Sequence, residues 1–187
     1  ALGAAVAELA TRDPDLRTVY ERLGPPPSRR EIPGFAALIR ILTAQQVSLA
    51  SASAIWTRLN QILEVTPDGV AAATDEEFRA AGFSRPKVRY ARALAEYVLT
   101  GKLDLDVLAE HDDEAVRAAL TAVPGIGNWT ADIYLLFCLG HPDIFPVGDL
   151  ALRRAVGDAF GRQAPPPADE VARLAEHWSP WRGVAAR

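Results

Sequence analysis

The segment Leu120-Thr-Ala-Val-Pro-Gly-Ile-Gly-Asn-Trp-Thr-Ala131 contains a tight turn between two helical stretches, and it decides how the rest of the chain is interpreted. Pro124 cannot continue the preceding helix, because proline lacks an N–H donor and its ring clashes with the turn before it. Gly125 and Gly127 permit a left-handed backbone and leave no Cβ to block a close approach, while Ile126 would point into the core. Backbone N–H groups at such a helix N-terminus form a phosphate site. The segment therefore predicts a hairpin that grips a nucleic-acid backbone without reading its sequence.

The alternative is an ordinary glycine-capped turn between two helices, because a motif this short also occurs by chance. A second feature favours the nucleic-acid interpretation. Asp149 lies about twenty residues downstream, where Gly148 makes a turn and a new helix begins. An aspartate there is a frequent N-cap, and the helix dipole favours its negative charge. The same carboxylate could stabilise positive charge on a deoxyribose as its base departs, or orient an attacking water, so the two roles are compatible.

Nearly every other segment has the periodicity of a helix, which predicts an all-α protein. Apolar residues spaced by three and four run from Phe35 to Leu63, which is long for one helix. The polar stretch Gln45-Gln46-Val47-Ser48 predicts a junction between two helices, with Ser48 as the N-cap of the second. Further helices are expected at 1–10, 14–20, 67–74, 75–81, 86–99, 113–122, 128–139, 149–160 and 168–178, and residues 181–187 would begin another. Glycines 82, 101, 140 and 161 stand where C-terminal caps are expected.

Composition excludes several kinds of site. With one cysteine, Cys138, the chain cannot form an intramolecular disulfide, a Cys-rich zinc site or a four-cysteine iron–sulfur cluster, and a lone thiol fits a reducing cytoplasm. The three histidines stand at unrelated spacings, which disfavours a histidine metal centre. No apolar run approaches the roughly 20 residues of a membrane span. The 187 residues, 49% of them hydrophobic, are enough for one compact domain or two lobes.

The net charge of −4 argues mildly against a nucleic-acid partner, but local charge matters more than the total. Residues 78–102 hold six basic side chains against the single acid Glu96. Such a stretch is a candidate phosphate-binding face, with Arg85, Lys87 and Arg89 as the candidate contacts. A solvated arginine-rich helix explains the same charge pattern equally well.

Together, the hairpin and the later aspartate resemble the helix-hairpin-helix (HhH-GPD) DNA glycosylase superfamily, and the flanking sequence is similar to its 3-methyladenine DNA glycosylase II (AlkA-like) branch. The segments that fit the branch are Ile41–Ser48, Ala81–Arg89, Gly127–Ala131 and Ala175–Arg182, so the resemblance runs from about Phe35 to the end. It implies a two-lobed all-α fold in which residues 1–187 form one glycosylase unit, with the helix-hairpin-helix at about 113–139. The N-terminal β-rich domain of some relatives is expected to be absent, because only about thirty residues precede Phe35.

The resemblance implies a particular chemistry. Asp149 occupies the catalytic aspartate position. Bifunctional relatives carry an attacking lysine where this chain has Trp129, and neither Lys87 nor Lys102 lies in the hairpin, so hydrolysis without abasic-site lyase activity is expected. Trp129 would line the base pocket and offer a cation–π contact to cationic alkylated purines; a core tryptophan that anchors the hairpin helix is the alternative. Tyr134 and Trp181 are weaker pocket candidates. Trp56 and Trp178 are expected in the core.

The resemblance also implies where DNA is bound. The hairpin would contact the DNA backbone through Gly125, Ile126, Gly127 and Thr130. Gln45 and Gln46 lie at the junction that faces the minor groove in this branch, and Gln46 falls on the wedge position that fills the gap left by a flipped nucleotide. A polar helix boundary at the surface is the alternative. A monovalent cation would be bound by the backbone carbonyls of Thr121, Val123 and Ile126, as is common in the superfamily.

The expected protein is a monomeric, cytoplasmic glycosylase of base excision repair that flips alkylated bases of the 3-methyladenine and 7-methylguanine class out of damaged double-stranded DNA. It would require no cofactor and hold no iron–sulfur cluster. Two alternatives remain open. A non-catalytic helix-hairpin-helix module would need only the hairpin, and a glycosylase for another lesion, such as hypoxanthine or ethenoadenine, would keep Asp149 but change the pocket.

Overall fold

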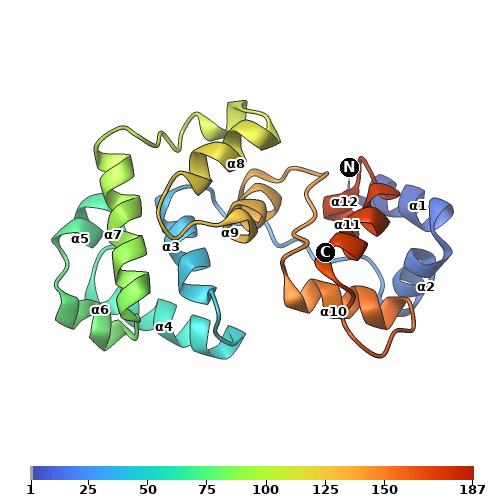
Figure 1. The fold of residues 1–187 in the computed structure, drawn as a ribbon, viewed down its shortest axis with the longest axis horizontal. Helices are drawn as coiled ribbons and strands as arrows, with labels where there is room; N and C mark the ends of the chain where they lie inside the picture. The colour runs from blue at the N-terminus through green and yellow to red at the C-terminus, as the bar shows by residue number, and fades with distance from the viewer. Residues whose placement is uncertain (1) are drawn as a thin grey trace. The chain divides into compact units, whose positions relative to one another are not determined.

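The computed structural model describes residues 2–187, and every regular element among them is a helix (Figure 1). This confirms the all-α prediction. The chain divides into two units: Ala1–Arg30 together with Leu135–Arg187 form the first, and Glu31–Tyr134 form the second. None of the helices described is both long and apolar enough to span a bilayer.

The second unit is built around α3 (Phe35–Ala44) and α7 (Arg85–Leu99), which pack together. Leu38 and Leu42 of α3 and Leu94 of α7 have no exposed surface. Burial of side chains of this size contributes about 1.5–3 kcal/mol each to the stability of the unit. The remaining helices of the unit are α4 (Leu49–Ile62), α5 (Pro67–Ala72), α6 (Asp75–Ala81), the 3-10 turn η1 (Leu108–Glu110), α8 (Asp113–Thr121) and α9 (Asn128–Ile133).

Short polar signals set the helix ends in this unit. The Ser48 hydroxyl accepts a hydrogen bond from the Ser51 backbone N–H (3.2 Å), which confirms Ser48 as the N-cap of α4. Thr74 and Glu77 form a reciprocal capping box at the start of α6, and Gly82 ends that helix with a left-handed φ of 100°. The long apolar run from 35 to 63 is therefore two helices with a short polar loop between them, as predicted.

The helix expected at 128–139 divides in two. The α-helix α9 is followed directly by a π-helical segment, η2 (Tyr134–Leu139). A π-helical segment shifts the backbone hydrogen bonds to i→i+5 but carries the same run of apolar residues, so periodicity alone predicts one α-helix. The 3-10 turn η1 was not predicted, because three residues are too few to show a period.

The first unit has its core around Trp178, which is 2% exposed, as expected for a core tryptophan. The ring centroids of Phe145 and Phe160 lie 5.4 and 6.4 Å from it. Its indole N–H donates to Oδ2 of Asp13 (2.7 Å), whose other oxygen caps α2 by accepting from the N–H groups of Asp15 and Leu16. The helices of this unit are α1 (Leu2–Arg12), α2 (Pro14–Leu23), α10 (Leu150–Ala159), α11 (Ala168–Glu176) and α12 (Arg182–Ala185), together with residues 135–139 of η2.

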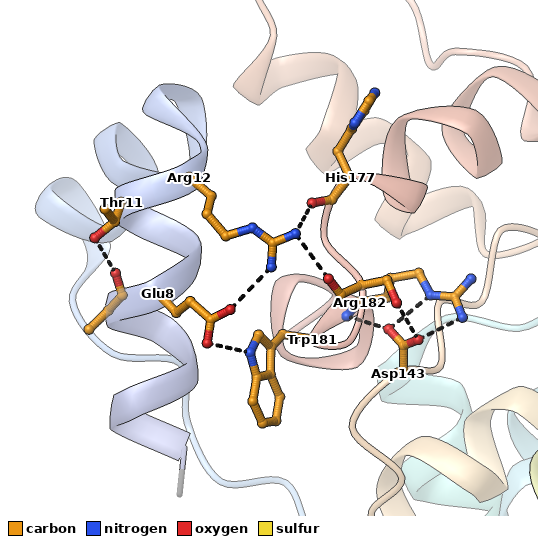
Figure 2. A network of polar contacts seen from close by, with 9 residues as sticks. Glu8, Thr11, Arg12, Asp143, His177, Trp181 and Arg182 are labelled. Atoms are coloured by element: carbon orange, nitrogen blue, oxygen red, sulfur yellow. Dashed lines mark hydrogen bonds and ion pairs between the residues drawn. The ribbon is translucent and has the colours of Figure 1, made fainter.

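Within this unit, hydrogen bonds join α1 to the turn that precedes α12 (Figure 2). Arg12 Nη2 donates to the carbonyl oxygens of His177 (2.7 Å) and Ser179 (2.9 Å). The indole N–H of Trp181 donates to Glu8 Oε2 (2.8 Å). Together with the Asp13–Trp178 contact, these bonds connect residues more than 160 positions apart in the chain.

Candidate functional site

The predicted hairpin is present between α8 and α9. The N–H of Ile126 donates to the carbonyl of Val123 (3.1 Å) and closes the turn, and both side chains are buried. Gly125 has a φ of +89°, and a Cβ placed on it would collide with the ring of Tyr90 from α7. Glycine is therefore required at this position for two reasons, the backbone conformation and the aromatic ring next to it.

An ion pair between Arg117 of α8 and Asp132 of α9 connects the two hairpin helices. Arg117 donates from Nε (3.0 Å) and Nη2 (2.8 Å) to Asp132 Oδ1. Asp132 is 8% exposed; burial raises the pKa of its carboxyl, and the hydrogen bonds and charge of Arg117 oppose that rise. Sequence reasoning missed this pair, because two opposite charges 15 residues apart have no distinctive spacing.

The two glutamines predicted as a wedge lie next to each other in the loop between α3 and α4, but their surroundings differ. Gln45 turns toward the hairpin: its Nε2 donates to the carbonyl of Gly125 (3.1 Å) and to Oγ1 of Thr130 (2.9 Å). Gln46 is exposed. Its φ is +56°, and among the described residues it is the one non-glycine residue whose φ is positive. Thr130 is 1% exposed, so its side chain supports the hairpin from within.

The three predicted phosphate contacts on α7 differ in their surroundings. Arg85 and Arg89 are exposed. Lys87 is partly buried, and its ammonium donates to the carbonyl oxygen of Thr43 (2.7 Å), near the end of α3. Burial lowers the pKa of this ammonium. The structure thus gives Lys87 a contact within the unit that the charge pattern did not indicate.

The aromatic candidates of the second unit are also placed differently. Trp129 lies in the first turn of α9 and is partly exposed. Tyr134 is fully buried, and its hydroxyl accepts a hydrogen bond from the N–H of Gly34 (2.9 Å), so it packs inside the unit. A role for either in a base pocket stays a prediction. Trp56, expected in the core, is only partly buried, with the guanidinium of Arg40 at 6.0 Å from its ring centroid.

The catalytic candidate Asp149 lies in the first unit and is the N-cap of α10, as predicted. Its Oδ1 accepts a hydrogen bond from the N–H of Leu152 (3.0 Å), and its own N–H donates to the carbonyl of Pro146 (2.9 Å). The side chain is partly exposed. This geometry fixes the carboxylate at a helix N-terminus, where the partial positive charge of the helix favours an anion.

The segment that leads to Asp149 is held by Asp143 (Figure 2). Asp143 accepts hydrogen bonds from Arg182 Nε (2.9 Å), from Arg182 Nη2 (2.8 Å) and from Ser179 Oγ (2.9 Å), and the N–H of Gly183 donates to the carbonyl of Pro142 (2.7 Å). Burial alone would raise the pKa of the Asp143 carboxyl, but the hydrogen bonds from Arg182 and Ser179 and the charge of Arg182 outweigh burial and hold the pKa below its usual value. The third pocket candidate, Trp181, is partly buried one residue before Arg182.

The proposed cation ligands are backbone carbonyls at the hairpin turn. The carbonyl of Val123 already accepts from Ile126, but a carbonyl oxygen has two lone pairs and can accept a second partner. Among the described residues, no cluster of His, Cys, Asp or Glu side chains is arranged to hold a metal ion. A monovalent cation at the carbonyls of Thr121, Val123 and Ile126 stays a prediction.

Comparison with known proteins gives a consistent result. The profile of the HhH-GPD superfamily base excision DNA repair proteins matches residues 39–180. The chain is 30% identical over 157 residues to DNA-3-methyladenine glycosylase 1 of Schizosaccharomyces pombe, covering 81% of this chain and 69% of the relative. It is 28% identical over 180 residues to DNA-3-methyladenine glycosylase 2 of Escherichia coli, covering 88% of this chain and 61% of the relative.

A solved structure is similar to nearly the whole chain. The S. pombe 3-methyladenine DNA glycosylase Mag1, solved in complex with abasic DNA, superimposes with a TM-score of 0.93 at 27% sequence identity. The alignment covers 98% of this chain and 93% of that one. The helix-hairpin-helix glycosylase fold expected from the sequence is thereby confirmed.

Proposed function

The chain belongs to the HhH-GPD superfamily of base excision DNA repair proteins, and on that premise we propose that it is a monofunctional DNA glycosylase that removes alkylated bases of the 3-methyladenine and 7-methylguanine class from duplex DNA. The proposal depends on one observation, which is that three features occur together in this chain. They are the glycine hairpin, Asp149 as the N-cap of α10, and a tryptophan at position 129. The hairpin supplies a grip on DNA, and the carboxylate supplies the chemistry.

The proposed reaction is hydrolysis of the bond between the base and C1′ of the deoxyribose. As that bond breaks, its electron pair goes to the base, which neutralises the positive charge of an alkylated purine and makes it a good leaving group. Positive charge develops on the sugar, and the Asp149 carboxylate stabilises it. Water then forms the C1′–O bond and loses a proton, which leaves the free base and an abasic site.

The positions of the two lysines support the proposal that the protein has no lyase activity. Lys87 donates to Thr43, and the ammonium of Lys102 lies 3.7 Å from Glu96 and 5.3 Å from the ring centroid of Tyr97. Residue 129, where bifunctional enzymes of the superfamily carry their nucleophile, is a tryptophan. A Schiff base with the sugar needs an amine at the reacting carbon, and the hairpin supplies none.

DNA binding and base selection are assigned to separate residues. The hairpin backbone at Gly125 and Gly127 would hold one phosphate, with the exposed guanidinium groups of Arg85 and Arg89 contributing charge. Trp129 would offer its indole face to the flipped base, where a cationic purine gains about 0.5–2 kcal/mol from the cation–π contact. Gln46 would fill the gap in the helix.

The test is base release from methylated duplex DNA. Wild type is expected to release 3-methyladenine, with strand breaks appearing only after heating in alkali. Asp149→Asn is expected to lower the release rate by on the order of 100- to 1000-fold, because a preorganised charge at the reacting centre is lost. Asp158→Asn is the matched control, since Asp158 is an exposed aspartate on the same helix, and its release rate should equal that of wild type.

Each other outcome of this assay has a distinct meaning. Tight binding of abasic-site DNA with no release of any base would favour the non-catalytic module. Strand cleavage without alkali would contradict the monofunctional assignment. Release of hypoxanthine or ethenoadenine but not of 3-methyladenine would keep the glycosylase and replace its substrate class.

A further inference from the structure

Two side-chain contacts hold the chain just before the exposed tip of the loop between α3 and α4. At the end of α3, the ammonium of Lys87 donates to the carbonyl oxygen of Thr43 (2.7 Å). At the start of the loop, the amide of Gln45 donates to the Gly125 carbonyl (3.1 Å) and to the Thr130 hydroxyl (2.9 Å). All of these residues belong to the second unit. The loop is therefore connected to α7 and to the hairpin by side chains rather than by its own backbone alone.

The residue at the tip has a backbone conformation that needs such support. Gln46 is exposed and has a φ of +56°, in the left-handed region. A side chain with a Cβ is disfavoured there, and such a conformation persists only where the surroundings impose it. The next residues leave apolar surface exposed as well, because Val47 is 38% exposed and Leu49 is 88% exposed. The loop thus presents a fixed polar tip with apolar neighbours to whatever it meets.

Lys87 is suited to a structural contact. It lies on α7 between Arg85 and Arg89, which are exposed, whereas Lys87 itself is partly buried. A lysine beside the last carbonyls of a helix satisfies acceptors that have no partner within that helix, and its charge complements the helix dipole. Thr43, the acceptor, is the next-to-last residue of α3 and is fully buried.

We propose that Gln45 and Lys87 are positioning residues for Gln46: they fix the loop so that Gln46 enters the DNA at a set distance from the phosphate held by the hairpin. The inference rests on the proposed function, since it requires a flipped nucleotide whose place Gln46 takes. It replaces the two roles that the sequence indicates, Gln45 as part of the wedge itself and Lys87 as a phosphate contact. Because Gln45 donates to the carbonyl of Gly125, the position of Gln46 is tied to that of the hairpin within this unit.

The first experiment measures single-turnover release of 7-methylguanine from a duplex, with Gln46→Ala, Gln45→Met and the double variant. Gln45→Met keeps the length of the side chain but removes both hydrogen bonds. Each single change is expected to slow release by roughly tenfold to a hundredfold, since a misplacement of about 1 Å has effects of that size. The double variant should be no slower than Gln46→Ala alone, because Gln45 acts only through Gln46. Effects that multiply would overturn the proposal.

The second experiment measures DNA affinity as a function of salt. Removing a phosphate contact reduces the slope of log K against log salt by about 0.9. Arg89→Met is expected to show that reduction, whereas Lys87→Met should keep the wild-type slope and still slow base release. Lys87→Arg is expected to release base faster than Lys87→Met and slower than wild type, because arginine retains a donor to the Thr43 carbonyl. A reduced slope for Lys87→Met would overturn the assignment.

A final set of measurements separates this inference from the proposed function. Affinity for a duplex with a tetrahydrofuran abasic analogue does not depend on catalysis, and 2-aminopurine beside that site reports unstacking. If wild type released no methylated base, the proposed function would fail, yet the same coupling between Gln45 and Gln46 would still be measured on this duplex. Thermal unfolding of each variant, with the exposed Asn60→Ala as the control, shows whether a loss reflects the loop or the fold.

Discussion

The hairpin and the Asp149 segment are held in place by different means. The hairpin depends on contacts inside one continuous stretch of about a hundred residues: a glycine over the Tyr90 ring, the Arg117–Asp132 ion pair and the amide of Gln45. The Asp149 segment depends on residues from distant parts of the chain, with Asp143 bound by Arg182 and the core around Trp178 closed by Asp13. DNA binding and base removal should therefore respond to different mutations.

The largest effect is expected for Gly125→Ala. The new methyl group would meet the Tyr90 ring on a backbone with φ of +89°, so we expect a loss of about 3 kcal/mol in the free energy of unfolding from strain and overpacking together. Gly127→Ala is the matched control, because nothing lies within 4 Å of its Cβ position and its φ is −98°. Chemical denaturation measures the free energy of unfolding of both variants. Equal stability of the two variants would contradict the role of Tyr90.

A smaller effect, in the other unit, is expected for Asp13→Ala. The change removes the N-cap of α2 and leaves the buried indole N–H of Trp178 without its carboxylate partner, which together should cost about 2 kcal/mol. Base release should become more sensitive to heat, while hairpin-dependent DNA binding at low temperature stays near wild type. The control Asp15→Ala alters an exposed acid two residues away. If Asp13→Ala lost DNA binding together with base release, the hairpin and the Asp149 segment would not be supported independently.

The smallest effect concerns pH and has opposite signs in the two regions. The pKa of Asp143 is lowered in the folded protein, so its stabilisation is present above the unfolded pKa and is lost as the pH falls through the folded pKa. The pKa of Asp132 is raised by burial, so its contribution is present below the unfolded pKa and is lost as the pH rises through the folded pKa.

Acid should therefore weaken the Asp143 contacts and favour the protonated Asp132. The stability advantage of wild type over Asp143→Asn is expected to shrink by about 1 kcal/mol between neutral pH and pH 3. The corresponding difference between wild type and Asp132→Asn should change in the opposite direction. Denaturation curves across this pH range measure both differences, and a common sign would refute the contrast.

Local signals made much of the fold predictable. The capping residues Ser48 and Asp149 and the glycines of the hairpin carry their structural role in their own chemistry, so the sequence alone places them. The same is true of the apolar faces of α3 and α7, because helical periodicity is a local property. The boundary between α9 and the π-helical segment was missed, since both share one apolar run.

The supports of the candidate site were not predictable in the same way. The sequence predicts DNA contacts for Lys87 and Gln45, but residue type and position in a motif do not indicate the partners that these side chains find within the protein. Tyr134 stays a predicted pocket residue, but no local signal in the sequence indicates that its hydroxyl accepts a hydrogen bond from the N–H of Gly34, a hundred residues away. Such pairings depend on the tertiary arrangement, which a single sequence does not encode at any fixed spacing.

The order of synthesis gives the divided first unit a further consequence. Ribosomes make the chain from its N-terminus, and domains generally fold as units during synthesis. Residues 31–134 form a continuous segment and can fold while translation is still under way, whereas α1 and α2 must wait for Trp178 and its neighbours before their core can close. We therefore expect a nascent chain to pass through a stage in which the hairpin has formed and the core around Trp178 has not.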